Sequence, residues 1–395
     1  MNSLPLPIRV LHVLGCMNIG GLETWLLHIL REINPQKVQM VFLVHTENHC
    51  AYDDEIRACG SRIIPCLTPS RPWMYARNFR RILKKYGPYD VVHSHVHHFS
   101  GFVLKLAHSA GVPVRIAHCH NDTTPVDCKA TMLRRMYLRL CEHWIRKHAT
   151  LGFAVSQKAA EALWGRDWST DERWRILRCA IDLEPFRRPV DGAAVRAELG
   201  IPQDALVVGH VGRFDPQKNH EFLLEIFKCL AKSRPNIRLL LVGDGPLRSD
   251  IEQKASGLGI TDKIIFAGLR RDVSRLMLGA MNVFVMPSLY EGLPIVGIEA
   301  QAAGLPYVLS DAITEEIEIE KTLVHWVRNN ASPAFWADAI MDAVDHAVVI
   351  PPATAVAGTH FDIQASAAEL CRIYTTHSFS LLQHKIDLNK TRRAA

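Results

Sequence analysis

The stretch VFVMPSLYEGLPIVGIEAQAAGLPYVLS, residues 283–310, places an amphipathic segment between two short apolar runs. The runs Val283–Met286 and Tyr307–Leu309 are apolar at successive positions, as strands that are buried on both faces are. The segment Pro294–Ala303 has the length of a short helix and opens on a proline, which suits a first helical turn. This order of strand, helix and strand predicts one unit of a parallel sheet covered by helices.

The same alternation extends along most of the chain. In the C-terminal half, further strands are predicted at Leu206–Val211, Ile237–Val242 and Lys263–Phe266, and helices at Asn219–Lys232, Leu247–Leu258, Val273–Ala280 and Pro333–His346. In the N-terminal half, strands are predicted at Ile8–Leu14, Val38–Val44, Ser61–Cys66, Asp90–His95, Val114–His120 and Leu151–Val155, and helices at Glu23–Ile33, Tyr75–Tyr86, Gly101–Ala110, Ala130–Lys147 and Lys158–Trp164. We therefore expect an α/β protein with two doubly wound, Rossmann-like domains.

The segment Asp182–Ala194 is rich in proline and charge and lacks periodicity, which predicts a hinge. It divides the chain into an N-terminal domain, 1–185, and a C-terminal domain, 186–360, followed by residues 361–395. The last part contains a predicted helix, Ile363–Thr376, which is expected to cross back toward the first domain, and a polar, basic tail. Because ligands bind outside the carboxyl ends of parallel strands, the two domains are expected to face a shared cleft.

The composition narrows the classes of function. Of 395 residues, 48% are hydrophobic and 22% charged, and the net charge is +6, which excludes a disordered chain and argues against a nucleic-acid partner. The small positive surplus fits an anionic substrate or anionic lipid. No two of the ten cysteines form a CxxC pair, so reduced thiols are expected. Neither a signal peptide nor a membrane span is predicted, so we expect a cytoplasmic protein that is either soluble or peripheral on the inner face of the cytoplasmic membrane.

Two glycine- or cation-containing loops follow predicted strands. Gly20 and Gly21 open a helix and let backbone N–H groups approach an anion, although a plain tight turn explains them equally well. Arg213 and Lys218 lie on either side of a proline-containing turn before another helix. Two cations at a helix N-terminus can neutralise a diphosphate without a metal ion. The alternative for this pair is a solvated basic loop.

Two carboxylates lie around the start of the helix predicted at Pro294. Glu291 precedes the helix, and Glu299, eight positions later, projects from its second turn. Carboxylates in a cleft accept hydrogen bonds from the paired hydroxyls of a ribose or hexose. The backbone of Gly292, Leu293 and Pro294 can contribute donors beside them. The alternative is two ordinary surface glutamates.

Six histidines lie at or just after two predicted strands: His93, His95, His97, His98, His118 and His120. His120 is nearest the carboxyl end of its strand and is best placed for the cleft. A metal site is an alternative, but no cysteine or carboxylate stands at a regular ligand spacing with these histidines. Contacts with sugar hydroxyls or backbone carbonyls are therefore favoured.

The loop that starts at Gly243 resembles a dinucleotide fingerprint and departs from it. Arg248 replaces the third glycine, and Pro246 removes a backbone donor. A nicotinamide-dependent dehydrogenase is therefore disfavoured, whereas a phosphate- or base-facing loop is compatible with the residues.

Taken together, these loops make the chain resemble the family-4 retaining, nucleotide-sugar-dependent glycosyltransferases, which have the GT-B architecture. The resemblance covers nearly the full length and is strongest in residues 283–310, where Glu291 and Glu299 match the family's Glu-x7-Glu motif. The stretches NIGGLETWL, DVVHSHVHHFSG and VRIAHCHND look most like bacterial exopolysaccharide and capsule enzymes of the EpsF type.

The resemblance implies roles for the second-domain residues. Arg213 and Lys218 would hold the donor diphosphate and stabilise the leaving nucleotide, Glu299 would hold the ribose, and Glu291 with the backbone of 292–294 would hold the transferred sugar. Arg270 would lie by the base and Gly243 beside the donor pocket.

From the first domain, the resemblance implies that Gly20 and Gly21 face the diphosphate and that His120 contacts the donor sugar near the reacting carbon. The family needs no metal ion or other cofactor. The expected donor is a UDP-hexose or UDP-N-acetylhexosamine, and the expected acceptor is a polyprenyl-linked or oligosaccharide molecule used for exopolysaccharide, capsule or lipopolysaccharide synthesis.

The segment Ala130–Lys147 carries an apolar stripe among basic residues, made of Leu133, Met136, Tyr137, Leu140 and Trp144. It predicts either a helix that packs on the core or a contact with anionic lipid near the acceptor. Two other functions keep the same fold. A nucleotide-sugar epimerase would act without an acceptor, and a non-catalytic partner subunit would be expected to lose the motif residues that this chain retains.

Overall fold

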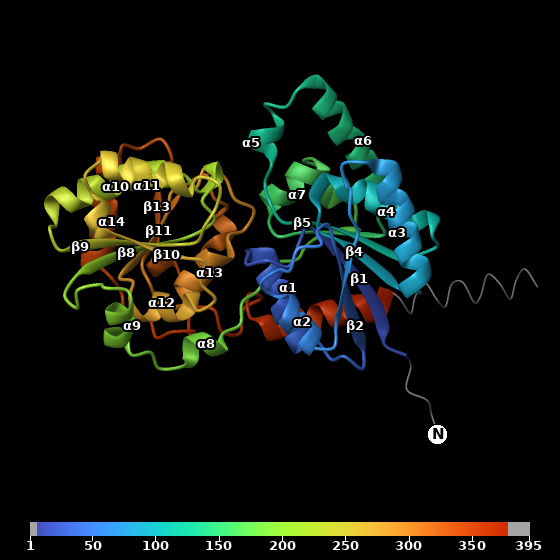
Figure 1. Cartoon of the computed structure of the whole chain (residues 1–395), viewed down its shortest axis with the longest axis horizontal. Coiled ribbons are helices and arrows are strands. Elements are labelled where there is room, and N and C mark those ends of the chain that lie inside the picture. Colours follow the sequence, from blue (N-terminus) through green and yellow to red (C-terminus); the bar gives the residue numbers. More distant parts are fainter. Residues whose placement is uncertain (1–5, 378–395) are drawn as a thin grey trace, which may run out of the picture. The chain divides into compact units, whose positions relative to one another are not determined.

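The computed structural model describes residues 6–377 and divides the chain into two compact units. Within the described residues, the first unit combines residues 6–180 with residues 363–377, and the second unit is Ile181–Asp362. Each unit is a parallel sheet with helices on both faces (Figure 1), which confirms the predicted α/β, doubly wound class.

The first unit contains a seven-stranded parallel sheet with the strand order β3-β2-β1-β4-β5-β6-β7. Its strands are β1 (Ile8–Leu14), β2 (Val38–Val44), β3 (Arg62–Pro65), β4 (Val91–Ser94), β5 (Val114–Cys119), β6 (Leu151–Ala154) and β7 (Trp174–Ile176). Its helices are α1 (Gly21–Glu32), α2 (Asp53–Ala58), α3 (Pro72–Tyr86), α4 (Ser100–Ser109), α5 (Thr124–Asp127), α6 (Met132–His148) and α7 (Gln157–Trp164), with 3₁₀ turns η1 (His97–Phe99) and η2 (Trp168–Thr170).

The second unit contains a six-stranded parallel sheet with the order β10-β9-β8-β11-β12-β13. Its strands are β8 (Leu206–Val211), β9 (Ile237–Val242), β10 (Ile264–Gly268), β11 (Val283–Met286), β12 (Tyr307–Ser310) and β13 (Val324–Val327). Its helices are α8 (Glu184–Arg187), α9 (Gly192–Glu198), α10 (His220–Ser233), α11 (Arg248–Gly257), α12 (Val273–Gly279), α13 (Ile295–Ala302) and α14 (Pro333–Asp345), with 3₁₀ turns η3 (Pro216–Lys218), η4 (Thr261–Lys263), η5 (Glu315–Ile317) and η6 (Lys321–Leu323).

The strand order of each sheet reverses between two central neighbours, β1 and β4 in the first unit and β8 and β11 in the second. These strands are buried on both faces; for example, every residue of β4 and of β11 is buried. Loops that leave such a pair diverge to opposite faces of the sheet and open a crevice at its carboxyl edge, where ligands bind in doubly wound folds. The loops after β1, β8 and β11 carry the glycines, cations and glutamates singled out in the sequence.

The division between the units differs from the predicted one. The first crossing lies at Ala180–Ile181 rather than at residue 185, because Ile181 pairs with Asp362 in a parallel bridge that places the two connecting segments side by side. The predicted hinge Asp182–Ala194 is not irregular throughout, since it contains α8 and the start of α9. Local periodicity did not show these helices because both are short.

The predicted last helix is present at residues 363–377 and is part of the first unit. The Tyr374 hydroxyl lies 2.7 Å from His93 Nδ1, and the Trp25 indole donates to Ser366 Oγ at 3.2 Å. The helix therefore packs on the same face of the sheet as α1 (Figure 1). The predicted polar tail, from Ser378, lies outside the described residues. No helix within residues 6–377 is both long and apolar enough to cross a membrane.

Candidate active site

The loop between β8 and α10 is shaped by its own side chains. Asp215 accepts a hydrogen bond from the backbone N–H of Lys218 at 3.3 Å and caps the 3₁₀ turn η3. Asn219 follows in the left-handed conformation, with φ 55°, and its side-chain amide donates to the carbonyl of Pro287 at 3.2 Å. The predicted helix at Asn219 therefore begins one residue later, at His220, and the loop is fixed to the segment after β11.

Lys218 meets Glu291 in a largely buried ion pair. Lys218 Nζ lies 2.6 Å from Glu291 Oε1, and the two side chains are 15% and 7% exposed. The second carboxylate oxygen accepts a hydrogen bond from Gln217 Nε2 at 2.9 Å, and the same amide donates to the carbonyl of Tyr290 at 3.0 Å. Gln217 thus orients Glu291. The sequence analysis missed Gln217, whose only signal is its place next to Lys218.

Arg213 differs from Lys218 in its surroundings. Its side chain is exposed, and no carboxylate among residues 6–377 forms an ion pair with it. The two cations of this loop are therefore one paired, largely buried ammonium and one guanidinium that is open to solvent.

Glu299 projects from the second turn of α13, as predicted. It is only partly exposed, and burial raises the pKa of its carboxyl group to about 7. Pro294 is not the first helical residue that the sequence predicted. It is the N-cap, with ψ 110°, and the helix begins at Ile295. The backbone of Gly292, Leu293 and Pro294 lies buried directly before the helix start.

Gly243 allows the loops after β8 and β9 to approach each other. Its φ of +134° is unfavourable for other residues, and a Cβ atom there would overlap the carbonyl oxygen of Gly212. Arg270 lies just after β10 and is held by two carboxylates, Asp272 at 2.7 Å and Glu198 at 2.7 Å, which raise the pKa of its guanidinium. A ligand at this loop has to compete with those ion pairs for Arg270.

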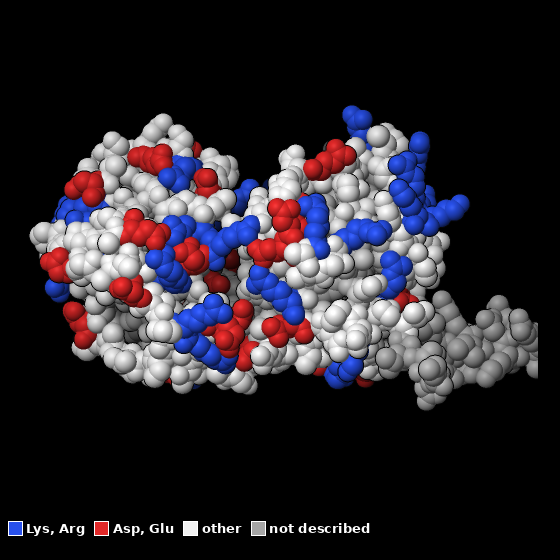
Figure 2. Space-filling view, turned by 60° about the horizontal axis from the view of Figure 1, so that its bottom comes forward, with Lys and Arg blue, Asp and Glu red and all other residues white. Residues whose placement is uncertain are grey.

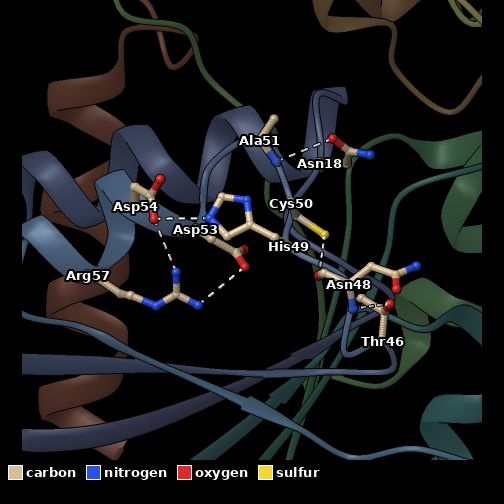
Figure 3. A network of polar contacts seen from close by, with 9 residues as sticks. All are labelled: Asn18, Thr46, Asn48, His49, Cys50, Ala51, Asp53, Asp54 and Arg57. Carbon is tan, nitrogen blue, oxygen red and sulfur yellow. Dashed lines mark hydrogen bonds and ion pairs between the residues drawn. The ribbon is translucent and has the colours of Figure 1, made fainter.

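In the first unit, Gly20 is the N-cap of α1 and Gly21 is its first residue, and a glycine has no side chain with which to cap the helix start. The Glu23 carboxylate lies beside Gly20, because a Cβ atom added there would meet Glu23 Oε2. The neighbouring loop after β2 is bonded to the segment before Gly20, since the N–H of Ala51 donates to Asn18 Oδ1 at 3.4 Å. Figure 3 shows this contact beside a second group, in which Asp54 accepts from His49 at 3.0 Å and from Arg57 at 3.2 Å. The loop that carries Gly20 and Gly21 is therefore hydrogen-bonded to the loop after β2.

His120 follows the last residue of β5 and is partly exposed. Its Nε2 lies 2.9 Å from His95 Nδ1, and its Nδ1 lies 3.6 Å from the sulfur of Cys179. It belongs to a cluster of imidazoles that also contains His93, His118 and His12. The sequence analysis did not select His12, although a polar residue inside the apolar run of β1 was a visible signal.

Burial lowers the pKa of every imidazole in this cluster. The pKa falls to about 3 for His12 and His118, and well below its usual value for His93, His95 and His120. Loss of hydration is the largest cause in each case. The five rings are therefore neutral near pH 7.

The helix α6 presents its apolar stripe to solvent. Leu138, Cys141 and Ile145 face the core, whereas Leu133 is 81% exposed, and Met136, Tyr137 and Leu140 are exposed too. The interpretation of the stripe as a core-packing face is therefore wrong for these residues. Trp144 is an exception, because its ring packs 5.8 Å from the ring of Phe102.

The predicted site residues fall into two sets. Arg213, Lys218, Gly243, Arg270, Glu291–Pro294 and Glu299 belong to the second unit, where the structure brings Lys218 and Glu291 into direct contact. Gly20, Gly21 and His120 belong to the first unit. That the two sets face one cleft stays a prediction.

Comparisons with known proteins agree on one family. A family model described as "Glycosyl transferases group 1" matches residues 192–347, and one described as "Glycosyl transferase 4-like domain" matches residues 20–179. EpsF of Bacillus subtilis (strain 168), named as a glycosyltransferase, is 39% identical over 341 residues, which are 85% of this chain and 87% of EpsF. The Escherichia coli UDP-Gal:alpha-D-GlcNAc-diphosphoundecaprenol alpha-1,3-galactosyltransferase is 28% identical over 235 residues, covering 58% of this chain and 60% of that enzyme.

Solved structures show the same fold. Anabaena HepE in complex with UDP and glucose superposes with a TM-score of 0.78 at 19% identity, covering 93% of this chain and 99% of HepE. WaaG, a glycosyltransferase involved in lipopolysaccharide biosynthesis, superposes with a TM-score of 0.67 at 20% identity, covering 96% of this chain and 99% of WaaG.

The two Rossmann-like units and the superposed structures indicate the GT-B fold. The family models and EpsF indicate that the chemistry is glycosyl transfer. The chain belongs to the family-4 glycosyltransferases of the GT-B fold and is similar to EpsF.

Proposed function

We propose that this protein transfers a sugar, with retention at the anomeric carbon, from a UDP-sugar to a lipid-linked or saccharide acceptor in the synthesis of a bacterial exopolysaccharide, capsule or lipopolysaccharide. The observation that carries the proposal is the Lys218–Glu291 pair, held by Gln217, at the carboxyl edge where the second sheet reverses its strand order. Such an edge is where doubly wound domains bind phosphate-containing ligands.

Each donor group has a proposed contact in the second unit. Arg213 and Lys218 hold the diphosphate and stabilise the charge that develops on the leaving phosphate, without a metal ion there. Glu299 accepts hydrogen bonds from the ribose hydroxyls. Glu291 and the backbone of 292–294 hold the transferred sugar. The loop of Gly243 lies beside the donor, with Arg270 near the base.

We assign further contacts with the donor to residues of the first unit. The helix start at Gly20 and Gly21, whose N-cap residue has no side chain, offers backbone N–H groups to the diphosphate. His120 contacts the donor sugar near the reacting carbon. UDP is the preferred nucleotide because the E. coli relative is named for UDP-Gal and HepE has been solved with UDP. The same relative is named for a diphosphoundecaprenol acceptor, which supports a lipid-linked acceptor here.

We further propose that α6 rests on an anionic membrane surface. The helix carries five Lys or Arg residues and a single glutamate beside its exposed apolar side chains. Figure 2 shows one face of the molecule, on which Lys and Arg are mixed with acidic residues over the second unit and gather with few acidic neighbours on part of the first unit, but it does not single out α6. An exposed apolar stripe with a basic rim fits the interface of an anionic bilayer.

Binding of the donor to the second unit is tested by ligand-induced shifts of the melting temperature. The melting temperature is measured with UDP-, GDP- and ADP-sugars, since ligands that bind the native state raise it. We expect UDP-sugars to raise it and the variant Arg213→Ala to lose the effect. Lys232→Ala, which removes an exposed positive charge at the far end of α10, is the matched control. An equal response of both variants would contradict the diphosphate assignment.

Transfer itself is tested with radiolabelled UDP-sugars and bacterial membranes. We expect label in a lipid-linked or saccharide product. Conversion of the donor to an isomer without an acceptor would identify an epimerase instead. Absence of any turnover with every nucleotide sugar would support a non-catalytic subunit.

The membrane contact is tested by vesicle flotation. We expect binding to phosphatidylglycerol vesicles but not to phosphatidylcholine vesicles. The double variant Leu133→Glu, Met136→Glu should weaken binding by about tenfold or more, because two apolar side chains no longer enter the interface. Val349→Glu, at a residue of the second unit that is 93% exposed, is the control. Unchanged flotation of the double variant would remove α6 from the contact.

A further inference from the structure

Five histidines lie on one face of the first-unit sheet, on three adjacent strands: His12 on β1, His93 on β4 with His95 directly after it, and His118 on β5 with His120 directly after it. Trp25 and Tyr374, both fully buried, pack against this group. No carboxylate among residues 6–377 forms an ion pair with any of the five. The cluster therefore has no carboxylate partner among the described residues, and two aromatic side chains pack against it.

Three of these histidines bring one ring nitrogen each close together. His95 Nδ1 lies 2.9 Å from His120 Nε2. His118 Nδ1 is fully buried and has no hydrogen-bond partner. One nitrogen from each of His95, His118 and His120 lies within 4.8 Å of the others. Nitrogens bound to one tetrahedral Zn²⁺ ion at its usual bond length are about 3.3 Å apart. The separations here, 2.9 Å for one pair and at most 4.8 Å for the others, bracket that value.

The opposite nitrogen of each ring has its own partner. His118 Nε2 donates to the carbonyl of Leu177 at 3.2 Å, which leaves Nδ1 with its lone pair, because a carbonyl can only accept. His95 Nε2 lies 3.0 Å from His12 Nδ1, and His120 Nδ1 lies 3.6 Å from the sulfur of Cys179. Metal-bound histidines have this arrangement, in which an outer partner fixes the tautomer and the ring orientation.

We propose that His95, His118 and His120 bind a divalent transition-metal ion, with Zn²⁺ as the ion that fits best. Three imidazole nitrogens are a ligand set that zinc accepts with a fourth position left open. That position would face the partly exposed side of the cluster, next to His120. Ligation also gives a partner to His118 Nδ1, whose burial without one is costly.

This site departs from the metal-free protein expected from the sequence. It lies in the first unit, whereas the proposed diphosphate contacts Arg213 and Lys218 lie in the second. The inference does not rest on the proposed function, but it competes with one part of it. His120 Nε2 bound to an ion is not available to the donor sugar, so zinc binding would take His120 out of the proposed sugar contact. A failure to bind zinc would leave the donor assignment untouched.

The test uses the full chain without a polyhistidine tag. The protein is stripped with a chelator, dialysed against Zn²⁺ alone, and analysed for zinc per chain. We expect one ion per chain and a higher melting temperature with zinc than with chelator. Co²⁺ in place of Zn²⁺ should give the strong visible absorption of a four-coordinate site. A chain that retains no zinc, or only as much as its His120→Gln variant, would overturn the proposal.

Three variants locate the ion. His120→Gln should weaken zinc binding by more than about 100-fold, since even outer partners of a metal site are worth 10- to 100-fold. His49→Gln, at a histidine of the same unit that is 63% exposed and bonded to Asp54, should bind as the parent does. His93→Gln should also retain zinc. Loss of zinc in His93→Gln with retention in His120→Gln would place the ion on the other histidine triad, His12, His93 and His95, and would refute this assignment.

Each variant is first compared with the parent in chelator by circular dichroism and melting temperature, so that a folding defect is recognised. The parent's zinc content and cobalt spectrum do not depend on any variant. They decide the proposal even if His120→Gln is unstable.

Discussion

Replacing Glu299 by glutamine should stabilise the second unit at alkaline pH. Burial raises the carboxyl pKa from its usual 4.5 to about 7 in the folded protein. The folded chain therefore binds more protons than the unfolded chain between these values, and its stability falls as the pH rises through that window. The difference between the two pKa values corresponds to at most about 3 kcal/mol, which is lost by pH 8. Glutamine has nearly the same shape and no charge, so the variant should not show this decline.

The measurement is the melting temperature of Glu299→Gln and its parent from pH 5 to pH 8. For a domain of this size, about 1 kcal/mol shifts the melting temperature by 2–4 °C. We expect the variant to exceed its parent by up to about 6–12 °C at pH 8 and by little at pH 5. Glu315→Gln, at an exposed glutamate of the same unit, should show no pH-dependent gain.

The same variant links stability to donor binding. If Glu299 holds the ribose, the more stable variant should bind the UDP-sugar more weakly, which titration calorimetry measures. A gain in stability that is the same at pH 5 and pH 8, or no gain at all, would refute the electrostatic reasoning. A pH-dependent gain with unchanged donor affinity would leave that reasoning intact and remove Glu299 from the donor site.

Two further predictions concern the loops of the second unit near Glu299. Lys218→Ala leaves the buried Glu291 carboxylate without its partner, so it should lower the free energy of unfolding, measured by urea titration, by about 3 kcal/mol. It should also reduce turnover more than acceptor binding. The double variant Lys218→Ala, Glu291→Gln should regain most of the stability but not the turnover. Gly243→Ala should lower the melting temperature and the donor affinity, because its Cβ atom would overlap Gly212 and its φ is positive. The control is Gly257→Ala, where an added Cβ meets nothing within 4 Å. This variant should leave the melting temperature and the donor affinity unchanged.

The sheets could be predicted because their central strands are apolar on both faces. β1, β8 and β11 follow directly from such runs, and the structure reproduces their predicted bounds. The edge strands β7 and β13 were missed. The other two edge strands, β3 and β10, were predicted although they are partly exposed too, so edge position alone does not explain the miss. β7 and β13 are short, and each contains polar or partly exposed residues. Their sequences therefore lack the continuous apolar character on which the prediction depended.

The helix α6 shows a second limit of periodicity. Its sequence contains two apolar faces, one with Leu138 and Ile145 and one with Leu133 and Met136. A hydrophobic stripe marks a side that avoids water, but it does not say whether protein or lipid covers it. The position of α4 decides this, because α4 packs closely against α6 where Gly101 meets the backbone of Cys141. That contact joins distant parts of the chain and leaves no local trace in the sequence.

The site residues could be selected one by one, but their contacts could not. Lys218 and Glu291 were selected because each follows a predicted strand. Their ion pair requires β8 and β11 to be neighbours, and this strand order is a property of the whole sheet. The same holds for Gln217, whose role exists only because Glu291 lies beside it. Residue type and local position thus predict which edge binds a ligand, and the sheet topology decides which side chains act together.

The pair also separates the two cations that the sequence treated alike. An ammonium group has three N–H donors, and Glu291 takes one of those of Lys218, so the others can still bind a phosphate oxygen without breaking the pair. The pair itself carries no net charge. The net positive charge that attracts a diphosphate to this loop therefore comes from the exposed Arg213, whose long-range effect salt would screen. On this argument Arg213 governs the capture of the donor, whereas Lys218, oriented through Glu291 and Gln217, governs how precisely the leaving phosphate is held.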